Sequence, residues 1–261
     1  MRLATFVPPG GEAPRAGEVR GEEIVAFADG STVLERLRSG ERGPARGEPF
    51  ALADVELLAP HVPRAIFGIG LNYLEHAREQ GKELPQAPIV FMKLPSSAAP
   101  PNAPVRRPAA VRRLDYEAEL AVVMGAGNEV AGYAVANDVS ARDLQRREPQ
   151  WTRAKGADGF CPFGPWITTA DEIDDPHDLR VRSWVNGEPR QDARTSELIF
   201  RVPALVDFIS EVITLEPGDL ILTGTPSGVG MALDPPRFLE PGDLVRIEIE
   251  GLGAIEHAIA G

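Results

Sequence analysis

The architecture of this chain follows from one stretch, Asp115-Tyr-Glu-Ala-Glu-Leu-Ala-Val-Val-Met-Gly125. Its apolar second half is typical of a buried strand, and two carboxylates, Glu117 and Glu119, stand at its polar start. Side chains at positions i and i+2 of a strand point to the same face, with backbones about 6.5 to 7 Å apart. Both carboxylates can therefore bend onto one cation.

A second run, from Ala131 to Ala141, also has the composition of a strand and carries Asp138 near its end. If the two strands pair across the short connection at 125–130, Asp138 falls opposite Ala118, between the two glutamates. A strict ladder would then put Asp138 on the wrong face of the sheet. The pairing therefore requires a β-bulge or a one-residue shift.

Three carboxylates converging at the end of an apolar strand cannot all stay ionised without a counter-charge. A hard divalent cation is the simplest source of that charge. Because no His or Cys accompanies the acids, the pattern favours Mg²⁺, Mn²⁺ or Ca²⁺ over Zn²⁺. The alternative is that Glu117 and Glu119 form the solvated face of an edge strand, and the spacing alone leaves it open.

Composition and charge exclude several classes of protein. With 261 residues, of which 43% are hydrophobic, the chain can bury a large core. Its 39 acids against 27 Lys and Arg give a net charge of −12, which argues against nucleic acid and anionic membranes as partners. The lone Cys161 excludes an intrachain disulfide and a C-x-x-C site. Without a signal-like or membrane-length apolar run, the chain is expected to be cytoplasmic.

Residues 1–60 are expected to form a small β-rich module, and residues 61–261 the main domain. In the module, 3–7 and 24–28 are strand candidates, 10–20 is expected to be a loop, and Ser31 is expected to cap a short helix. Nothing in this module suggests chemistry.

A short apolar strand at 65–70 leads into a polar segment that contains His76 and Glu79. On a helical turn these two residues, three positions apart, face the same way and can hydrogen-bond. A His oriented by a carboxylate is the usual general-base pair. The alternative is a surface helix with a charged pair. The flexible composition that follows, from Gly81 to Pro85, is typical of a lid.

Polar residues farther along the chain are candidates for the same site. Arg142 and Gln145 follow Asp138 by four and seven positions and would share a helix face, and Lys155 belongs to a second cationic element. A strand at 220–223 leads into the glycine-rich segment 224–230, whose backbone N–H groups can bind a carboxylate. The Asn186-Gly187 pair predicts a hairpin over 181–190, and 202–213 has the spacing of an amphipathic core helix.

These motifs occur in an order that resembles the fumarylacetoacetate hydrolase family over roughly residues 64–250. The matching motifs are Asn72-Tyr-x-x-His76-x-x-Glu79, Asp115-Tyr-Glu117-x-Glu119-Leu, Asn137-Asp138-x-Ser-Ala-Arg142-Asp143-x-Gln145, Trp151-Thr-x-x-Lys155 and Thr223-Gly-Thr225-Pro-x-Gly-Val-Gly230. The length resembles the branch that contains acylpyruvate hydrolases, oxaloacetate decarboxylases and 2-hydroxyhepta-2,4-diene-1,7-dioate isomerases.

The resemblance implies an α+β, β-rich fold, a mixed β-sandwich roll with the small N-terminal module attached, and a homodimer. It implies that three acids hold Mg²⁺ or Mn²⁺, that a His–Glu pair and a Lys are catalytic, and that three further residues contact the substrate. The implied metal ligands are Glu117, Glu119 and Asp138, the catalytic residues His76, Glu79 and Lys155, and the substrate contacts Arg142, Gln145 and Thr225.

The expected function is metal-dependent hydrolysis of a C–C bond in a small anionic 2,4-dioxo acid of the acylpyruvate type, which releases a pyruvate enolate. Decarboxylation of a 2-oxo acid such as oxaloacetate, or isomerisation of a diene-dioate, uses the same enolate chemistry and is the alternative. A non-enzymatic metal-stabilised β protein would explain the carboxylates, but not the His76/Glu79 pair or the glycine-rich segment.

Overall fold

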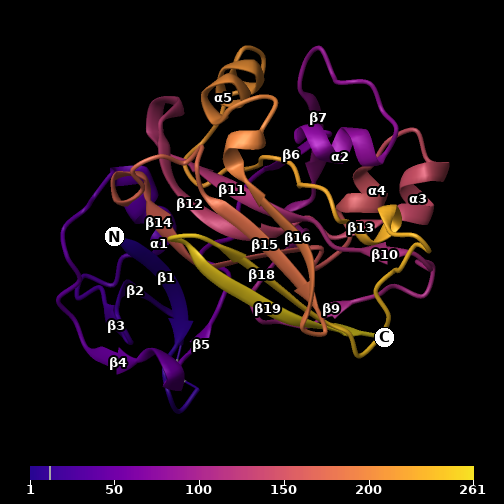
Figure 1. Ribbon diagram of the computed structural model, residues 1–261. Coiled ribbons are helices and arrows are strands. Elements are labelled where there is room, and N and C mark those ends of the chain that lie inside the picture. The colour runs from indigo at the N-terminus through magenta and orange to yellow at the C-terminus, as the bar shows by residue number, and fades with distance from the viewer. Residues whose placement is uncertain (12) are drawn as a thin grey trace.

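A computed structural model describes residues 1–11 and 13–261. The fold is mostly β, with 37% of residues in strands and 19% in helices, and the predicted β-rich α+β class is confirmed. Two large sheets carry most of the structure, and the helices lie at their ends and edges (Figure 1). No helix within the described ranges is long and apolar enough to cross a membrane.

The larger sheet has 12 strands, in the order β4-β3-β2-β1-β14-β12-β11-β17-β6-β7, with β5 paired to β1 and β8 paired to β14. Most of its pairs are antiparallel, but β6 with β17 and β8 with β14 are parallel. Its strands are β1 (Arg2–Val7), β2 (Arg15–Arg20), β3 (Glu23–Ala26), β4 (Pro49–Ala51), β5 (Glu56–Leu57), β6 (Ile66–Gly70), β7 (Ile89–Lys93), β8 (Ala98–Ala99), β11 (Ala118–Met124), β12 (Val130–Asn137), β14 (Cys161–Thr169) and β17 (Leu220–Leu222).

A five-stranded sheet, ordered β16-β15-β18-β19-β9, packs against the larger one, and a two-stranded ladder joins β10 to β13. The remaining strands are β9 (Val105–Arg106), β10 (Leu114–Asp115), β13 (Ser140–Ala141), β15 (Arg180–Val185), β16 (Glu188–Arg194), β18 (Leu244–Ile249) and β19 (Gly253–Ala260). The helices are α1 (Val33–Ser39), α2 (Leu74–Glu79), α3 (Arg142–Arg147), α4 (Thr152–Lys155) and α5 (Val202–Ser210). The predicted hairpin at Asn186-Gly187 is present. The predicted core helix is also present, but it ends at Ser210 and not at 213, and Val212 and Ile213 are exposed.

Strand β11 lies at the centre, and both of its faces are buried. Leu120 and Val122 pack into the core between the two sheets, whereas Ala121 and Val123 pack into a second core on the opposite face. Because side chains alternate along a strand, Glu117 and Glu119 belong to the same face as Ala121 and Val123. The carboxylates therefore continue a buried apolar row, and the alternative of a solvated edge strand is wrong.

The N-terminal strands extend the larger sheet, because β1 pairs with β14 at Leu3↔Ile167. In Figure 1 they form the indigo edge of the molecule, remote from α2, α3 and α4. Two local expectations were wrong: part of the expected loop is strand β2, and Thr32, not Ser31, caps α1, in a reciprocal capping box with Glu35. Thr32 has the better position because its side chain accepts from the N3 backbone N–H. The boundary at residue 60 stays a prediction.

Candidate metal and acid–base site

The register of β11 and β12 brings the third carboxylate to the first two. Ala118 pairs with Asn137, so Asp138 follows opposite Glu117, and its backbone N–H donates to the Glu117 carbonyl at 2.9 Å. The shift comes from an irregularity between Val123 and Met124 near the turn. The expectation that a bulge or a one-residue shift is required is confirmed. It places Asp138 directly across from a glutamate on the same face.

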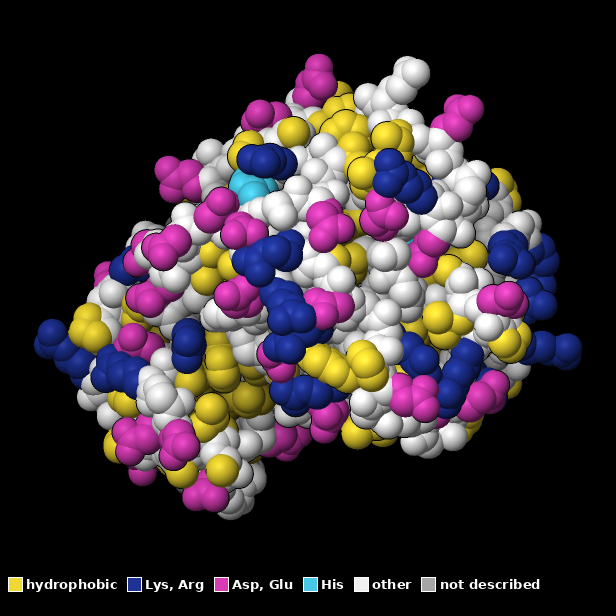
Figure 2. All heavy atoms as spheres, viewed as in Figure 1, with side chains coloured by type: hydrophobic (Ala, Val, Ile, Leu, Met, Phe, Trp, Pro, Cys, Tyr) yellow, Lys and Arg dark blue, Asp and Glu magenta, His cyan; other side chains and the backbone are white. Residues whose placement is uncertain are grey.

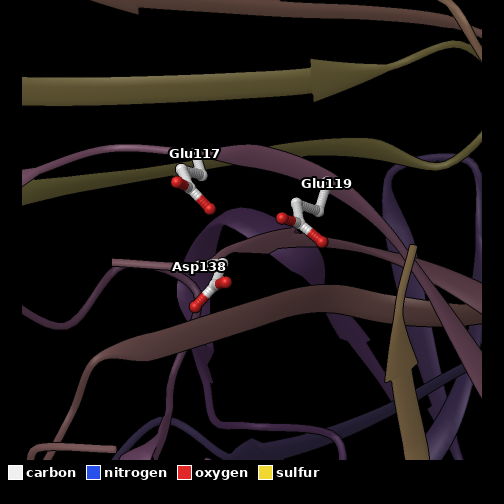
Figure 3. A group of neighbouring side chains, drawn as sticks. All are labelled: Glu117, Glu119 and Asp138. Carbon is white, nitrogen blue, oxygen red and sulfur yellow. The ribbon is translucent and has the colours of Figure 1, made fainter. Parts of the chain in front are cut away.

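Glu117, Glu119 and Asp138 converge on one point (Figure 3), each offering an oxygen within 4.8 Å of the others. All three are buried, with Asp138 fully inaccessible. Carboxylates held this close in a low-dielectric interior repel one another strongly. The arrangement therefore needs positive charge.

Two buried lysines supply part of that charge. Lys155 Nζ lies 2.6 Å from Glu117 Oε2 and 2.6 Å from Asp138 Oδ2, and Lys93 Nζ lies 2.5 Å from Asp138 Oδ1. The role of Lys93, at the end of β7, was missed from sequence. The signal that could have revealed it is a single Lys closing an apolar strand, a position where a charged side chain is buried only with a partner.

Glu119 is the carboxylate that these lysines leave without an ion pair among the described residues. Burial, together with the charges of Asp138 and Glu117, raises the pKa of Glu119 well above its usual range. A backbone N–H, that of Gly224, donates to its Oε2 at 2.7 Å. In contrast, although burial raises the pKa of Glu117, Lys155 and Arg142 more than offset this and hold that pKa below its usual range. Without a cation beside it, Glu119 is therefore the carboxyl whose negative charge is the less favourable of the two, and a bound cation would stabilise that charge.

The three residues fit a divalent cation. They offer oxygen donors alone, converge within a radius that one ion can span, and carry more negative charge than the adjacent lysines neutralise. Oxygen-only donor sets suit Mg²⁺, Mn²⁺ or Ca²⁺.

Arg142, at the start of α3, is buried and ties the site to the rest of the fold. Its Nε donates to Asp115 Oδ2 at 2.8 Å, and its Nη2 forms an ion pair with Glu117 Oε1 at 2.6 Å. Gln145 accepts from Arg142 Nη1 at 3.0 Å. The expected shared face of Arg142 and Gln145 toward the carboxylates is therefore present.

Asp115 is the acceptor of several hydrogen bonds in the same region. Besides Arg142, its carboxylate accepts backbone N–H groups of Tyr116, Gly230 and Met231 at 2.8–3.1 Å. The Asp115 side chain thereby holds the glycine-rich segment against β10. Asp115 belongs to a sequence motif, but its spacing there does not reveal this role.

Helix α2 carries the His–Glu pair. His76 Nδ1 lies 2.6 Å from Glu79 Oε1, and His76 Nε2 lies 2.7 Å from the amide nitrogen of Gln80. Because an amide nitrogen only donates, Nε2 accepts and carries the lone pair, and the proton on Nδ1 is donated to Glu79. This is the tautomer that a general base acting through Nε2 requires.

Two glycines let the segment 224–230 reach these side chains. At Gly224, where φ is +100°, a Cβ would lie 2.7 Å from the Cβ of Asn72. At Gly228, where φ is +101°, a Cβ would lie 2.1 Å from the Arg190 carbonyl oxygen. Only glycine fits both positions. The Gly228 N–H donates to Glu79 Oε2 at 2.9 Å, so Glu79 links α2 to this segment.

Thr225 is held by Gln191, a buried residue of the five-stranded sheet. Gln191 on β16 donates to Thr225 Oγ1 at 2.7 Å and to the Pro226 carbonyl at 2.8 Å, while its oxygen accepts the Ala118 N–H at 3.1 Å. One buried amide thus connects the five-stranded sheet, β11 and the glycine-rich segment. No sequence pattern marks such a residue, because its partners lie far away along the chain.

Most of the candidate residues line one cavity of about 590 Å³. Its walls include His76, Glu79, Glu117, Arg142, Gln145, Lys155 and Thr225. The other three histidines are not among its lining residues: His61 bonds the Gly218 carbonyl, His257 contacts Asn137, and His177 pairs with Asp175.

The fold is β-rich. Its site combines a buried triad of oxygen donors, which suits a metal ion, with a His–Glu pair. Residues 65–260 match the family described as fumarylacetoacetate (FAA) hydrolase C-terminal, and the chain belongs to this family. The family resemblance seen in the sequence is thereby confirmed.

Three relatives illustrate the range of the family. A mitochondrial oxaloacetate tautomerase (fahd2) of Xenopus laevis is 44% identical over 220 residues, covering 79% of this chain and 69% of the relative. The 2-hydroxyhepta-2,4-diene-1,7-dioate isomerase of Mycobacterium marinum is 39% identical, with a TM-score of 0.83 over 100% of this chain and 98% of the other. A maleylpyruvate hydrolase of Sphingobium sp. SYK-6, in complex with manganese(II) and pyruvate, is 32% identical, with a TM-score of 0.80 over 100% of this chain and 99% of the other.

Proposed function

We propose that this chain is a metal-dependent hydrolase that cleaves the C–C bond of a small anionic 2,4-dioxo acid of the acylpyruvate type. One observation carries the proposal: Lys155 and a His76 whose Nε2 carries the lone pair line a single cavity, together with Glu117 of the buried oxygen-donor triad. The proposal includes Mg²⁺ or Mn²⁺ as the ion, a homodimer as the assembly and a cytoplasmic location.

Glu117, Glu119 and Asp138 would hold the ion. When bound, it supplies Lewis-acid polarisation of the oxygens of a 2-oxo acid group. Lys155 and Arg142 add fixed positive charge, which attracts the substrate carboxylate.

His76 supplies the acid–base step. Once the Gln80 amide has released Nε2, this nitrogen takes a proton from water, and the water oxygen forms a bond to the C4 carbonyl carbon. The C3–C4 bond then breaks, giving a carboxylic acid and the enolate of pyruvate. His76 returns its proton to C3 of that enolate, so that water and the dioxo acid become a carboxylic acid and pyruvate. Glu79 keeps Nδ1 protonated and stabilises the imidazolium that forms in between.

Keto–enol tautomerisation or decarboxylation of a 2-oxo acid is the second candidate. The name of the Xenopus relative favours tautomerisation. Tautomerisation needs only that His76 move a proton at C3, without an attacking water. The same residues would serve both reactions.

Steady-state assays with acetylpyruvate, oxaloacetate and a diene-dioate, each with and without EDTA, test the proposal. We expect EDTA-sensitive release of pyruvate and acetate from acetylpyruvate. Turnover of oxaloacetate or the diene-dioate without acetylpyruvate cleavage would favour the second candidate. Absence of EDTA-sensitive turnover with all three substrates would contradict both.

A further inference from the structure

Two cations line the cavity without an ion-pair partner among residues 1–11 and 13–261. They are Lys82, just after α2, and Arg146, on α3. Both are exposed, whereas the other two lining cations, Arg142 and Lys155, are buried and paired. Figure 2 shows Lys and Arg side chains gathered where α3 and α4 lie in Figure 1.

Three acids near these two cations are engaged by other partners. Glu148 forms ion pairs with Arg147 at 3.3 Å and Arg153 at 2.6 Å, which leaves Arg146 without it. On the other side of the cavity, Glu75 pairs with Arg78 at 2.6 Å. Glu79 is occupied by His76 and the Gly228 N–H. In a chain with 39 acids against 27 Lys and Arg, unpaired cations at a cavity are not explained by a shortage of acids.

With a divalent ion at the triad, the buried end of the cavity can accept about one negative charge. Four carboxylates, those of Asp115, Glu117, Glu119 and Asp138, face three cations, Lys93, Arg142 and Lys155. A divalent ion at the triad turns this balance from one negative to one positive charge. One carboxylate of a 2-oxo acid neutralises it, so Lys82 and Arg146 remain available at the exposed part of the cavity.

We propose that Arg146 and Lys82 form a distal anion site that binds a second carboxylate, at the far end of the substrate. The preferred substrate class is then a 2-oxo dicarboxylate, in preference to an acylpyruvate with an uncharged tail. Ile69, Phe91 and Trp151 line the same cavity and offer apolar surface to the intervening carbon chain. This inference rests on the proposed function for the orientation of the 2-oxo end.

The guanidinium of Arg146 is the stronger of the two determinants. Its planar fork can bind a carboxylate through two parallel hydrogen bonds, whereas the Lys82 ammonium acts as a point charge. Arg147, the next residue, provides a matched control, because it is exposed and already paired and is not among the lining residues.

Calorimetry with two non-cleavable probes tests the distal site on Mn²⁺-loaded protein. The probes are 2-oxoadipate and 2-oxohexanoate, which have the same chain length and the same 2-oxo acid group but differ in the terminal carboxylate. We expect the wild type to bind 2-oxoadipate about tenfold more tightly. Arg146→Gln should remove most of that preference and leave 2-oxohexanoate binding unchanged, Lys82→Gln should reduce it less, and Arg147→Gln should preserve it.

Equal binding of the two probes by the wild type would overturn the distal site and leave the proposed function standing. A preference that persists in Arg146→Gln and in the double variant with Lys82→Gln would overturn the assignment to these residues. If neither probe binds the Mn²⁺-loaded wild type, the 2-oxo acid function fails, and the distal site fails with it.

Discussion

Lys93 Nζ lies 2.5 Å from Asp138 Oδ1 and 3.3 Å from the Val139 carbonyl oxygen. The Lys93 side chain is fully buried, and the residue is not among those that line the cavity. Lys155 differs in this respect, because it pairs with the same aspartate and also lines the cavity. Lys93 is therefore a permanent counter-charge, whereas Lys155 is also placed to meet a ligand.

Lys93→Met should destabilise the metal-free protein by about 3–5 kcal/mol, because it leaves a buried carboxylate with one cation fewer. Added Mn²⁺ should recover more unfolding free energy in the variant than in the wild type, because the triad is then more negative. Urea unfolding with and without MnCl₂ measures both quantities. Met92→Leu, at an exposed position of the same strand, is the control. An identical loss with and without Mn²⁺ would show that Lys93 contributes packing and not charge.

Glu119→Gln should abolish tight binding of Mg²⁺ or Mn²⁺ in calorimetry. The glutamine side chain keeps an oxygen that can accept the Gly224 N–H, but it removes one negative charge from the metal ligands. Because it also relieves repulsion with Glu117 and Asp138, the metal-free variant should be at least as stable as the wild type. Unchanged metal affinity would rule out this ligand set, and a collapse of the fold would show that Glu119 is needed for structure.

The site could be predicted from sequence where its members lie on one strand or one helical turn. Glu117 with Glu119, and His76 with Glu79, are such pairs, and the periods of strand and helix place them together. The need for a shifted register at Asp138 also followed from the two-residue period of a strand, although its location at Val123 did not.

Long-range partners could not be found in the same way. Lys93 meets Asp138 across 45 positions, and Gln191 meets Ala118 across 73. Such contacts depend on which strands become neighbours in the larger sheet and on how the five-stranded sheet packs, and no local period encodes either. The error at the start of α1, which Thr32 caps instead of Ser31, is smaller. Adjacent Ser and Thr are nearly equivalent as caps, so the sequence places this helix end only to within one residue.

His257 should make stability depend on pH. Burial lowers its pKa to about 4, from a model-peptide value near 6.5. Below about pH 6.5 the unfolded chain binds a proton that the folded chain excludes until about pH 4, so stability falls across this window by at most about 3 kcal/mol. Above the window His257 makes no pH-dependent contribution.

The test compares unfolding free energies of wild type and His257→Gln at about pH 7 and about pH 4.5. The advantage of the wild type should shrink by roughly 2–3 kcal/mol at the lower pH. Groups that are present in both proteins and distant from residue 257 cancel in the difference. His177→Gln should show a smaller change, because His177 is only partly buried. If the difference in unfolding free energy does not vary with pH, His257 binds its proton equally well in the folded and the unfolded state, and the prediction is wrong.

His76→Ala should separate hydrolysis from decarboxylation. If His76 activates water, its loss should lower kcat/KM for acetylpyruvate roughly 10²- to 10⁴-fold. Oxaloacetate loses CO₂ without an attacking water, so its decarboxylation should fall much less, whereas Asp138→Ala should abolish both reactions. Glu79→Gln should give an intermediate loss in hydrolysis, because the amide cannot stabilise the imidazolium as a carboxylate does. Arg78→Gln, on the same helix but paired outward with Glu75, is the control and should leave both rates unchanged. Equal losses on both substrates in His76→Ala would show that His76 does not act on water, and the hydrolase proposal would give way to the tautomerase alternative.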